Sequence, residues 1–152
     1  MAMITVDTQF GLLGLEEQDG AIVRVVWDGS DDAPDSPLLQ EAAAQMRAYE
    51  AGRLQRFDLP LRVAGSAFQQ AVCAQMSAIP FGETRTYGEI ASALGQSAQS
   101  VGGACGGNPI PIIIPCHRVM GAGGRLTGFS GAGGVETKVA LLRHEGAAGL
   151  LI

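Results

Sequence analysis

The amino-acid sequence predicts a small α/β unit followed by a mainly α-helical unit. Within residues 1–64, short apolar runs of strand length are followed by one helical pattern, which is typical of a mixed unit. Residues 65–152 instead contain several helix N-terminal signals close together. The chain has 152 residues, of which 47% are hydrophobic, so each unit can bury a core. Gly65 marks the expected boundary between the two domains.

Three strands are expected at the start of the first unit. Apolar runs lie at Ile4–Val6, Phe10–Leu15 and Ala21–Trp27. The dipeptide Asp19-Gly20 between the last two runs favours a tight hairpin turn. These runs should therefore form antiparallel strands.

One helix and one further strand complete this unit. Ser36 is a good N-cap, and Pro37 suits the first helical position. Apolar residues then recur at helical spacing until Gly52 ends the pattern; they are Leu39, Ala42, Ala43, Met46 and Tyr49. The stretch Phe57–Val63 predicts a fourth strand.

The second unit opens with a helix that begins after Ser66. Ser66 and Gln69 have the spacing of a capping box. The apolar residues that follow share one helical face; they are Phe68, Val72, Met76 and Ile79. Pro80 and Gly82 should end this helix.

Two shorter helices come next. Thr86 and Glu89 form another capping box, and Gly95 closes the helix, whose inward residues would be Ile90, Ala93 and Leu94. Ser97 can cap a second helix over Ala98–Cys105. The pair is typical of a helix-turn-helix whose second helix meets DNA, although any two short helices fit this pattern loosely.

An apolar segment rich in proline leads to the most informative residues. Prolines interrupt and flank the run Ile110–Ile114, fixing φ and removing N–H donors, which predicts a buried strand edge that stops at Cys116. His117 follows directly. A Cys-His pair by itself fits catalysis or inert packing, because free cysteines are commonly buried.

Glycine dominates the sequence between this pair and a final helix expected from Val135 to Glu145. The segments Gly121–Gly124 and Gly128–Gly134 contain no Gly-Lys-Ser/Thr ending, so they are not a phosphate loop. They fit either a flexible connection or a pocket wall whose bare N–H groups face a planar ligand.

Charge differs between the two parts of the chain. Residues 1–65 hold five arginines and eleven acidic residues, a net charge of −6, whereas residues 66–152 hold five basic and four acidic residues, a net charge of +1. The second part can therefore approach a polyanion, but it lacks the basic patch of a strong nucleic-acid binder.

Cysteine spacing and hydropathy exclude several other classes. Cys73, Cys105 and Cys116 have no C-x-x-C spacing, which argues against a disulfide framework and a zinc knuckle. No apolar run is long enough to cross a bilayer, and the N-terminus does not have the pattern of a secretory signal. We expect a soluble cytoplasmic protein that does not bind membranes.

Several short motifs, in this order, resemble those of the methylated-DNA–protein-cysteine methyltransferases, which repair 6-O-alkylguanine. They are Phe68-Gln69, Ile79–Thr84, Thr86-Tyr87-Gly88, Gly107-Asn108-Pro109, Ile114–Val119, Gly128–Gly131 and His144-Glu145-Gly146. The resemblance covers about residues 45–146. It implies an RNase H-like N-terminal domain over residues 1–64 and a winged helix-turn-helix domain over residues 65–152 that binds DNA and carries the acceptor thiol.

The resemblance also implies the chemistry. Cys116 would take the alkyl group of 6-O-methylguanine, with 4-O-methylthymine as a second candidate substrate, once and irreversibly, after the base has rotated out of the duplex. His117 would act as the base through a water molecule, and Glu145 would orient the imidazole. Without the resemblance, Glu145 before Gly146 would fit a solvated charge at a helix end.

Further roles follow from the same resemblance. Asn108 would tie the recognition helix to the cysteine segment, although an ordinary turn residue fits equally. Tyr87 would donate to the guanine ring and help the nucleotide rotate, although a core aromatic also fits. Backbone groups of Val119 and Ser130 would read the flipped base, and Phe129 would supply an apolar wall.

The expected DNA-contacting helix departs from the family pattern. Gln99 stands where an arginine is usual, and the neutral Ser100 follows it. DNA affinity should therefore be low and weakly dependent on salt, because few counterions are displaced. A second departure, Cys73 in place of a common tryptophan, should change only core packing.

The expected partner is double-stranded DNA that contains alkylated bases, with no cofactor, no metal and no obligate protein partner; a monomer is the default. Two other functions stay open. A non-enzymatic module could bind alkylated bases and recruit repair proteins, but such modules lack the cysteine. A small cysteine hydrolase would turn over repeatedly on an ester or peptide.

We predict that Gln99→Arg tightens DNA binding at low salt, because a cation on the recognition helix adds a phosphate contact. Affinity measured across a salt series should increase, with a steeper salt slope by roughly one counterion. An unchanged affinity and slope would place Gln99 away from DNA.

Overall fold

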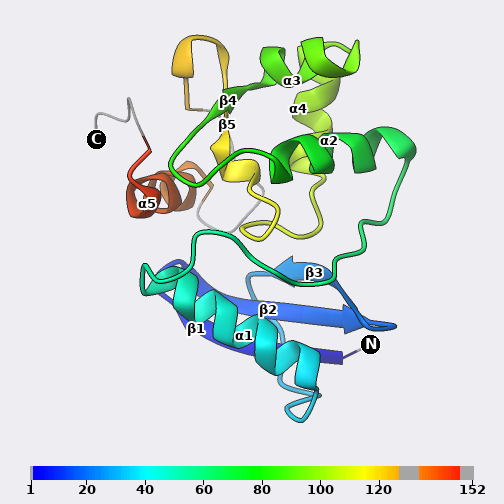
Figure 1. Cartoon of the computed structure of the whole chain (residues 1–152), viewed down its shortest axis with the longest axis vertical. Helices are drawn as coiled ribbons and strands as arrows, with labels where there is room; N and C mark the ends of the chain where they lie inside the picture. Colours follow the sequence, from blue (N-terminus) through cyan, green and yellow to red (C-terminus); the bar gives the residue numbers. More distant parts are fainter. Residues whose placement is uncertain (1, 127–133, 148–152) are drawn as a thin grey trace. The chain divides into compact units, whose positions relative to one another are not determined.

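The fold is that of a computed structural model, which describes residues 2–126 and 134–147. The chain divides into two compact units, Met1–Val63 and Ala64–Ile152. Each unit has its own sheet and helices, and each is described by itself (Figure 1).

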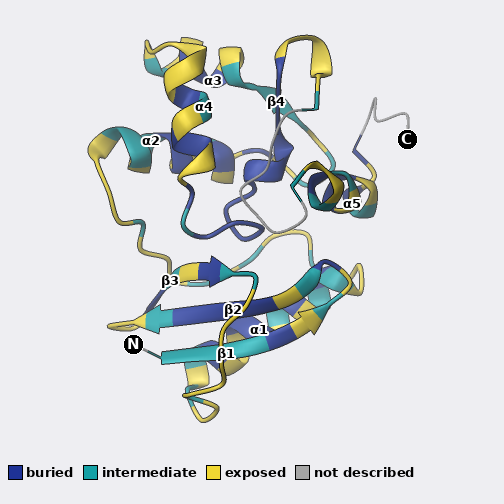
Figure 2. Ribbon diagram, turned by 180° about the vertical axis from the view of Figure 1, so that it is seen from behind, coloured by how far each residue is buried: buried dark blue, intermediate teal, exposed yellow. Residues whose placement is uncertain are grey.

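The first unit is built on a three-stranded antiparallel sheet in the order β1-β2-β3. The strands are β1 (Ala2–Thr8), β2 (Gly11–Gln18) and β3 (Ala21–Val26). Asp19 and Gly20 both have positive φ, 51° and 80°, as a tight primed hairpin turn requires. The three predicted strands are therefore confirmed, with the central strand β2 largely buried (Figure 2).

Helix α1 (Pro37–Glu50) lies across one face of this sheet (Figure 1). The Ser36 hydroxyl accepts a hydrogen bond from the Leu39 amide at 3.2 Å, as an N-cap does. The predicted apolar face is buried in full: Leu39, Ala42, Ala43, Met46 and Tyr49. This helix was predicted correctly, including its cap.

The fourth strand predicted over Phe57–Val63 is wrong. Only one bridge forms, between Leu61 and Ile22, flanked by hydrogen bonds from the Ile22 amide to the Pro60 carbonyl and from the Arg62 amide to the Ile22 carbonyl. Pro60 has no N–H to donate, so the pairing cannot extend along the segment.

The second unit begins with α2 (Ala67–Ser77), capped by the Ser66 hydroxyl, which accepts from the Gln69 amide at 3.1 Å. The Gln69 side chain does not close the expected capping box. Its amide donates instead to the Ala104 carbonyl at 2.8 Å and so ties α2 to α4. Ile79 is buried but lies beyond the end of the helix.

Helices α3 (Tyr87–Leu94) and α4 (Ala98–Gly106) are joined by a turn at Gly95, whose φ of 65° is left-handed. Both hydrogen bonds of the Thr86–Glu89 capping box are present, at 2.9 and 3.0 Å. The buried residues of α3 are Ile90 and Ala91; the prediction that Ala93 points inward is wrong, because its side of the helix is exposed. Ser97 caps α4 as predicted.

The C-terminal elements of the second unit place Cys116 and His117 between α2 and a last helix. A single-turn 3-10 helix η1 (Cys116–Arg118) leads into β5 (Val119–Met120), which pairs in parallel with β4 (Arg85–Thr86). After η2 (Ala122–Gly124), helix α5 (Val135–Glu145) ends at Gly146, as predicted. Among the described residues, none of the helices has the length and apolarity needed to cross a membrane.

Glycine in the middle of α4 makes this helix intrinsically weak. A Cβ at Gly103 would meet no atom within 4 Å, so alanine fits there without strain. We expect Gly103→Ala to raise the free energy of unfolding by about 0.8–1 kcal/mol in urea denaturation. The matched control is Gly95→Ala, which has equal space but a φ of 65° and should destabilise by about 1 kcal/mol. Equal effects of the two substitutions would contradict this explanation.

Candidate active site

Cys116 stands at the end of a buried, tightly turned segment. The Ile114 amide donates to the Ile110 carbonyl at 2.9 Å, and Ile112 between them has a left-handed φ of 71°. The strand edge predicted over Ile110–Ile114 is therefore wrong: the segment folds into a turn, because its prolines cannot donate to a ladder and Ile112 reverses the chain. Cys116 opens η1 with 6% of its surface exposed.

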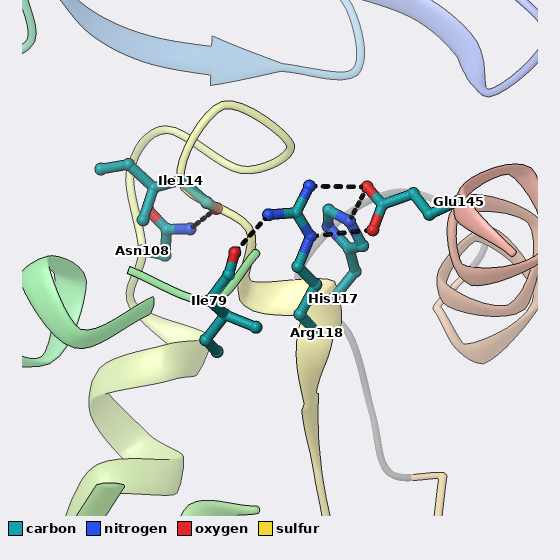
Figure 3. A network of polar contacts seen from close by, with 6 residues as sticks. All are labelled: Ile79, Asn108, Ile114, His117, Arg118 and Glu145. Atoms are coloured by element: carbon teal, nitrogen blue, oxygen red, sulfur yellow. Dashed lines mark hydrogen bonds and ion pairs between the residues drawn. The ribbon is translucent and has the colours of Figure 1, made fainter. Parts of the chain in front are cut away.

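Asn108 holds this turn closed. Its side-chain amide donates to the Ile114 carbonyl at 2.8 Å (Figure 3). Its carbonyl oxygen accepts from the Ile110 amide at 3.0 Å. Asn108 follows α4 and is 95% buried. The structure thus places Asn108 between the end of α4 and the segment that carries Cys116, where it does more than an ordinary turn residue.

His117 and Glu145 meet although 28 residues separate them. His117 Nε2 lies 2.7 Å from Glu145 Oε2, and both side chains are fully buried. Because an ionised carboxylate only accepts, the proton belongs on Nε2, which leaves the lone pair on Nδ1. His117 Nδ1 is buried and has no hydrogen-bond partner within residues 2–126 and 134–147. The alternative of a solvated Glu145 is excluded by this burial.

Arg118 is the third member of this network, to which sequence reasoning assigned no role. Its Nε and Nη2 donate to the two oxygens of Glu145 at 2.8 and 3.0 Å (Figure 3). Nη1 donates to the Ile79 carbonyl at 2.6 Å, and the guanidinium carbon lies 5.8 Å from the centre of the Phe81 ring. The only sequence signal was its place beside His117.

The network fixes the protonation of Glu145. Burial alone would raise the pKa of this carboxyl, but hydrogen bonds from His117 and Arg118 outweigh it and lower the pKa from 4.5 to about 2. Burial also lowers the pKa of His117, against the pull of Glu145 and with the support of the cations Arg118 and Lys138. The stable state is an ionised carboxylate beside a neutral imidazole.

Lys138 brings a second buried cation to the site, and sequence reasoning missed it as well. Its ammonium donates to the Val119 carbonyl at 2.6 Å and lies 6.0 Å from the centre of the Tyr87 ring. Burial lowers the pKa of Lys138, while the neighbouring Cys116 and Cys105 raise it. The signal was available, because Lys138, Leu141 and Glu145 recur on one face of α5.

The thiols of Cys105 and Cys73 lie in surroundings that raise their pKa values. Burial and the nearby thiols Cys116 and Cys73 raise the pKa of Cys105 to about 12, with Lys138 opposing them. Burial likewise raises the pKa of Cys73, against a hydrogen bond from Gln69. Both therefore stay protonated and unreactive.

The remaining predicted residues fall into three groups. Tyr87 and Val119 lie around Lys138 beside the Cys116 segment. Gln99 and Ser100 are exposed on the first turn of α4, outside this buried network. Phe129 and Ser130, like most of the glycine-rich stretch, lie outside the described residues. Among residues 2–126 and 134–147, no group of three His, Cys, Asp or Glu side chains could hold a metal ion.

Comparison with known proteins identifies relatives along nearly the whole chain. The profile described as the DNA-binding domain of 6-O-methylguanine DNA methyltransferase matches residues 67–147. A methylated-DNA–protein-cysteine methyltransferase of Mycolicibacterium paratuberculosis is 42% identical over 150 residues, which cover 93% of this chain and 90% of the relative.

Solved structures of other proteins are also similar to this chain. The crystal structure of Mycobacterium tuberculosis O6-methylguanine methyltransferase has 40% identity and a TM-score of 0.84 over 95% of this chain and 92% of that chain. The structure of Mycobacterium tuberculosis OGT in complex with DNA has 40% identity and a TM-score of 0.85, with coverage of 96% and 93%.

The low pKa of Glu145 predicts how stability depends on pH. Because this carboxyl is a stronger acid in the folded state, its contribution is complete above about pH 4.5 and is lost as the pH falls towards 2. We expect the free energy of unfolding to fall by about 3 kcal/mol over this range through Glu145 alone.

Denaturant unfolding of Glu145→Gln between pH 2 and pH 5 should give a flatter profile than the wild type. Glu136→Gln, at an exposed position on the same helix, should leave the profile unchanged. Equal slopes for the wild type and Glu145→Gln would contradict the prediction.

Proposed function

The chain belongs to the 6-O-methylguanine DNA methyltransferase family, and we propose that it repairs DNA by moving the methyl group of 6-O-methylguanine onto its own Cys116. The observation that carries the proposal is the buried Cys116-His117 pair whose imidazole is held by Glu145 at 2.7 Å. Because the sulfur would be alkylated and nothing in the reaction restores it, each molecule would act once.

The reaction needs a thiolate, a base and a stabilised leaving group. The Cys116 proton passes to His117 Nδ1, the thiolate attacks the methyl carbon in line, an S–C bond forms and the C–O bond breaks. The electron pair stays on the guanine oxygen, and the base leaves as an anion that is then protonated. His117 fits the role of base because its Nε2 proton is fixed on Glu145, which leaves Nδ1 as the acceptor. As in the family, a water molecule would link Nδ1 to the sulfur.

Charge around the sulfur supports thiolate formation. Arg118 and Glu145 cancel each other, and Lys138 adds one buried positive charge within electrostatic reach of Cys116. A nearby cation favours the thiolate over the thiol. Cys105 and Cys73, whose pKa values are raised by burial, are not competing acceptors.

The base would be read beside this centre. The Val119 amide already donates to the Cys116 carbonyl, so only the Val119 carbonyl can contact a flipped base, with the lone pair that Lys138 leaves. Tyr87 opens α3 beside Lys138 and is the proposed donor to the leaving guanine. Ser130 and Phe129 are proposed to complete the pocket.

We also propose the finer fold and the partner. The sheet and α1 would be an RNase H-like domain, and α2–α5 with the β4–β5 pair a winged helix-turn-helix domain that binds alkylated double-stranded DNA. The match of residues 67–147 to a DNA-binding domain and the DNA complex of the Mycobacterium tuberculosis relative support this. Helix α4, with Gln99 and Ser100 exposed, would face the DNA, and the target base would rotate out to reach a buried sulfur.

We expect one methylene of added mass per protein, on Cys116, after incubation with excess duplex oligonucleotide that contains 6-O-methylguanine. Intact-protein mass spectrometry with peptide mapping would measure it. Cys116→Ala should stay unmodified and still bind the lesion in a gel shift, whereas the matched variant Cys105→Ala should be methylated normally.

Other outcomes would reject the proposal. An unmodified wild-type protein that binds the lesion would indicate a module that recruits other repair proteins. Repeated turnover on an ester or peptide would indicate a hydrolase, and methylation of Cys116→Ala would show that another residue is the acceptor.

A further inference from the structure

Arg118 makes contacts that hold it in place independently of His117. Its Nη1 donates to the Ile79 carbonyl, just after α2 (Figure 3). Its guanidinium carbon lies 5.8 Å from the centre of the Phe81 ring. It is 94% buried. These contacts fix the guanidinium plane independently of Glu145.

The other edge of the guanidinium determines how Glu145 is oriented. Nε and Nη2 bind one carboxylate oxygen each, at 2.8 and 3.0 Å, and such a two-point contact allows one orientation of the carboxylate plane. Oε2 is the oxygen that Arg118 Nη2 and His117 Nε2 share. The position of the imidazole thus depends on Arg118 through Glu145.

Arg118 also determines the net charge next to the His117 imidazole. A buried carboxylate without a counter-cation would favour protonation of the neighbouring His117, and an imidazolium cannot accept the Cys116 proton. Besides Glu145 and Arg118, the charged group that acts on His117 is Lys138 on α5, among the described residues. Cys116 precedes His117 in η1, and the one ionisable side chain of α2 is the thiol Cys73. Arg118 binds both oxygens of Glu145 and so cancels its charge.

We propose that Arg118 is a positioning residue for alkyl transfer, which orients Glu145 and cancels its charge so that His117 stays neutral with Nδ1 ready to accept a proton. This inference rests on the proposed function for its kinetic consequence. Its effect on His117 is independent of whether Cys116 accepts an alkyl group.

The test compares Arg118→Gln, which removes the cation, with Arg118→Lys, which retains it. Single-turnover transfer from an oligonucleotide containing 6-O-methylguanine is measured against pH. For Arg118→Gln the acid limb of the pH–rate profile should shift to higher pH by about one unit. At pH values on the acid side of the limb the rate should therefore fall about tenfold. Arg118→Lys should keep the limb near that of the wild type, with a lower plateau because lysine cannot grip both oxygens in one plane.

The imidazole is followed directly by 15N NMR of the full chain. The protein has two histidines, so His144 is an internal reference. His117 should be neutral with Nε2 protonated in the wild type and should take up a proton at higher pH in Arg118→Gln. Arg85→Gln, which removes a half-exposed arginine of the same unit, should change neither readout.

Three outcomes would overturn the proposal. They are an unchanged His117 titration in Arg118→Gln, the same shift of the acid limb in Arg118→Lys, and a loss of rate that only follows the folded fraction, which would show a structural role. If Arg118→Gln does not fold, the double variant Arg118→Gln/Glu145→Gln is used, because it leaves no unpaired carboxylate. The acid limb of its pH–rate profile should stay near that of the wild type. A wild-type protein that never accepts the methyl group would reject the proposed function while the NMR test still decides the role of Arg118.

Discussion

The buried carboxylate of Glu145 is the constraint on which the rest of the site depends. It joins η1 to α5 through His117 and Arg118, and Arg118 extends the connection to the end of α2 through the Ile79 carbonyl. A carboxylate can be buried only where its charge and lone pairs are satisfied, so these three segments must come together for the unit to fold. The same requirement places Cys116 beside a neutral, oriented imidazole.

Charge is divided within the site in a way that suits a single nucleophile. Glu145 and Arg118 neutralise each other, and Lys138 adds a further buried cation near Cys116. Cys105 lies near the same cation, but its burial raises its pKa to about 12. These surroundings favour a thiolate at Cys116 over one at Cys105 or Cys73, in keeping with the role proposed for Cys116.

The proposed reactive centre and the surface proposed to meet DNA are built very differently. The centre is buried and its charged groups are hydrogen-bonded to one another, whereas α4 exposes Gln99, Ser100 and glycine, which supply neither charge nor helix stability. In such a protein, discrimination would come from contacts to the flipped base more than from the phosphates. Asn108 is the physical link between the two, because it follows α4 and closes the turn before Cys116.

The sequence by itself determined the local features of this protein. Caps at Ser36, Thr86 and Ser97 and the turn at Asp19-Gly20 were predictable because each depends on residues within one turn of the chain. The candidate nucleophile and its partners followed from short motifs in order along the chain.

Tertiary structure decided what depends on distant partners. The strand predicted over Phe57–Val63 failed because pairing is limited by Pro60, and Ile110–Ile114 became a turn because Asn108 binds both of its ends. The sequence analysis assigned no role to Arg118 or Lys138. Only burial against Glu145 and the Val119 carbonyl makes them part of the site, since a charge acquires its role from the groups that replace water around it.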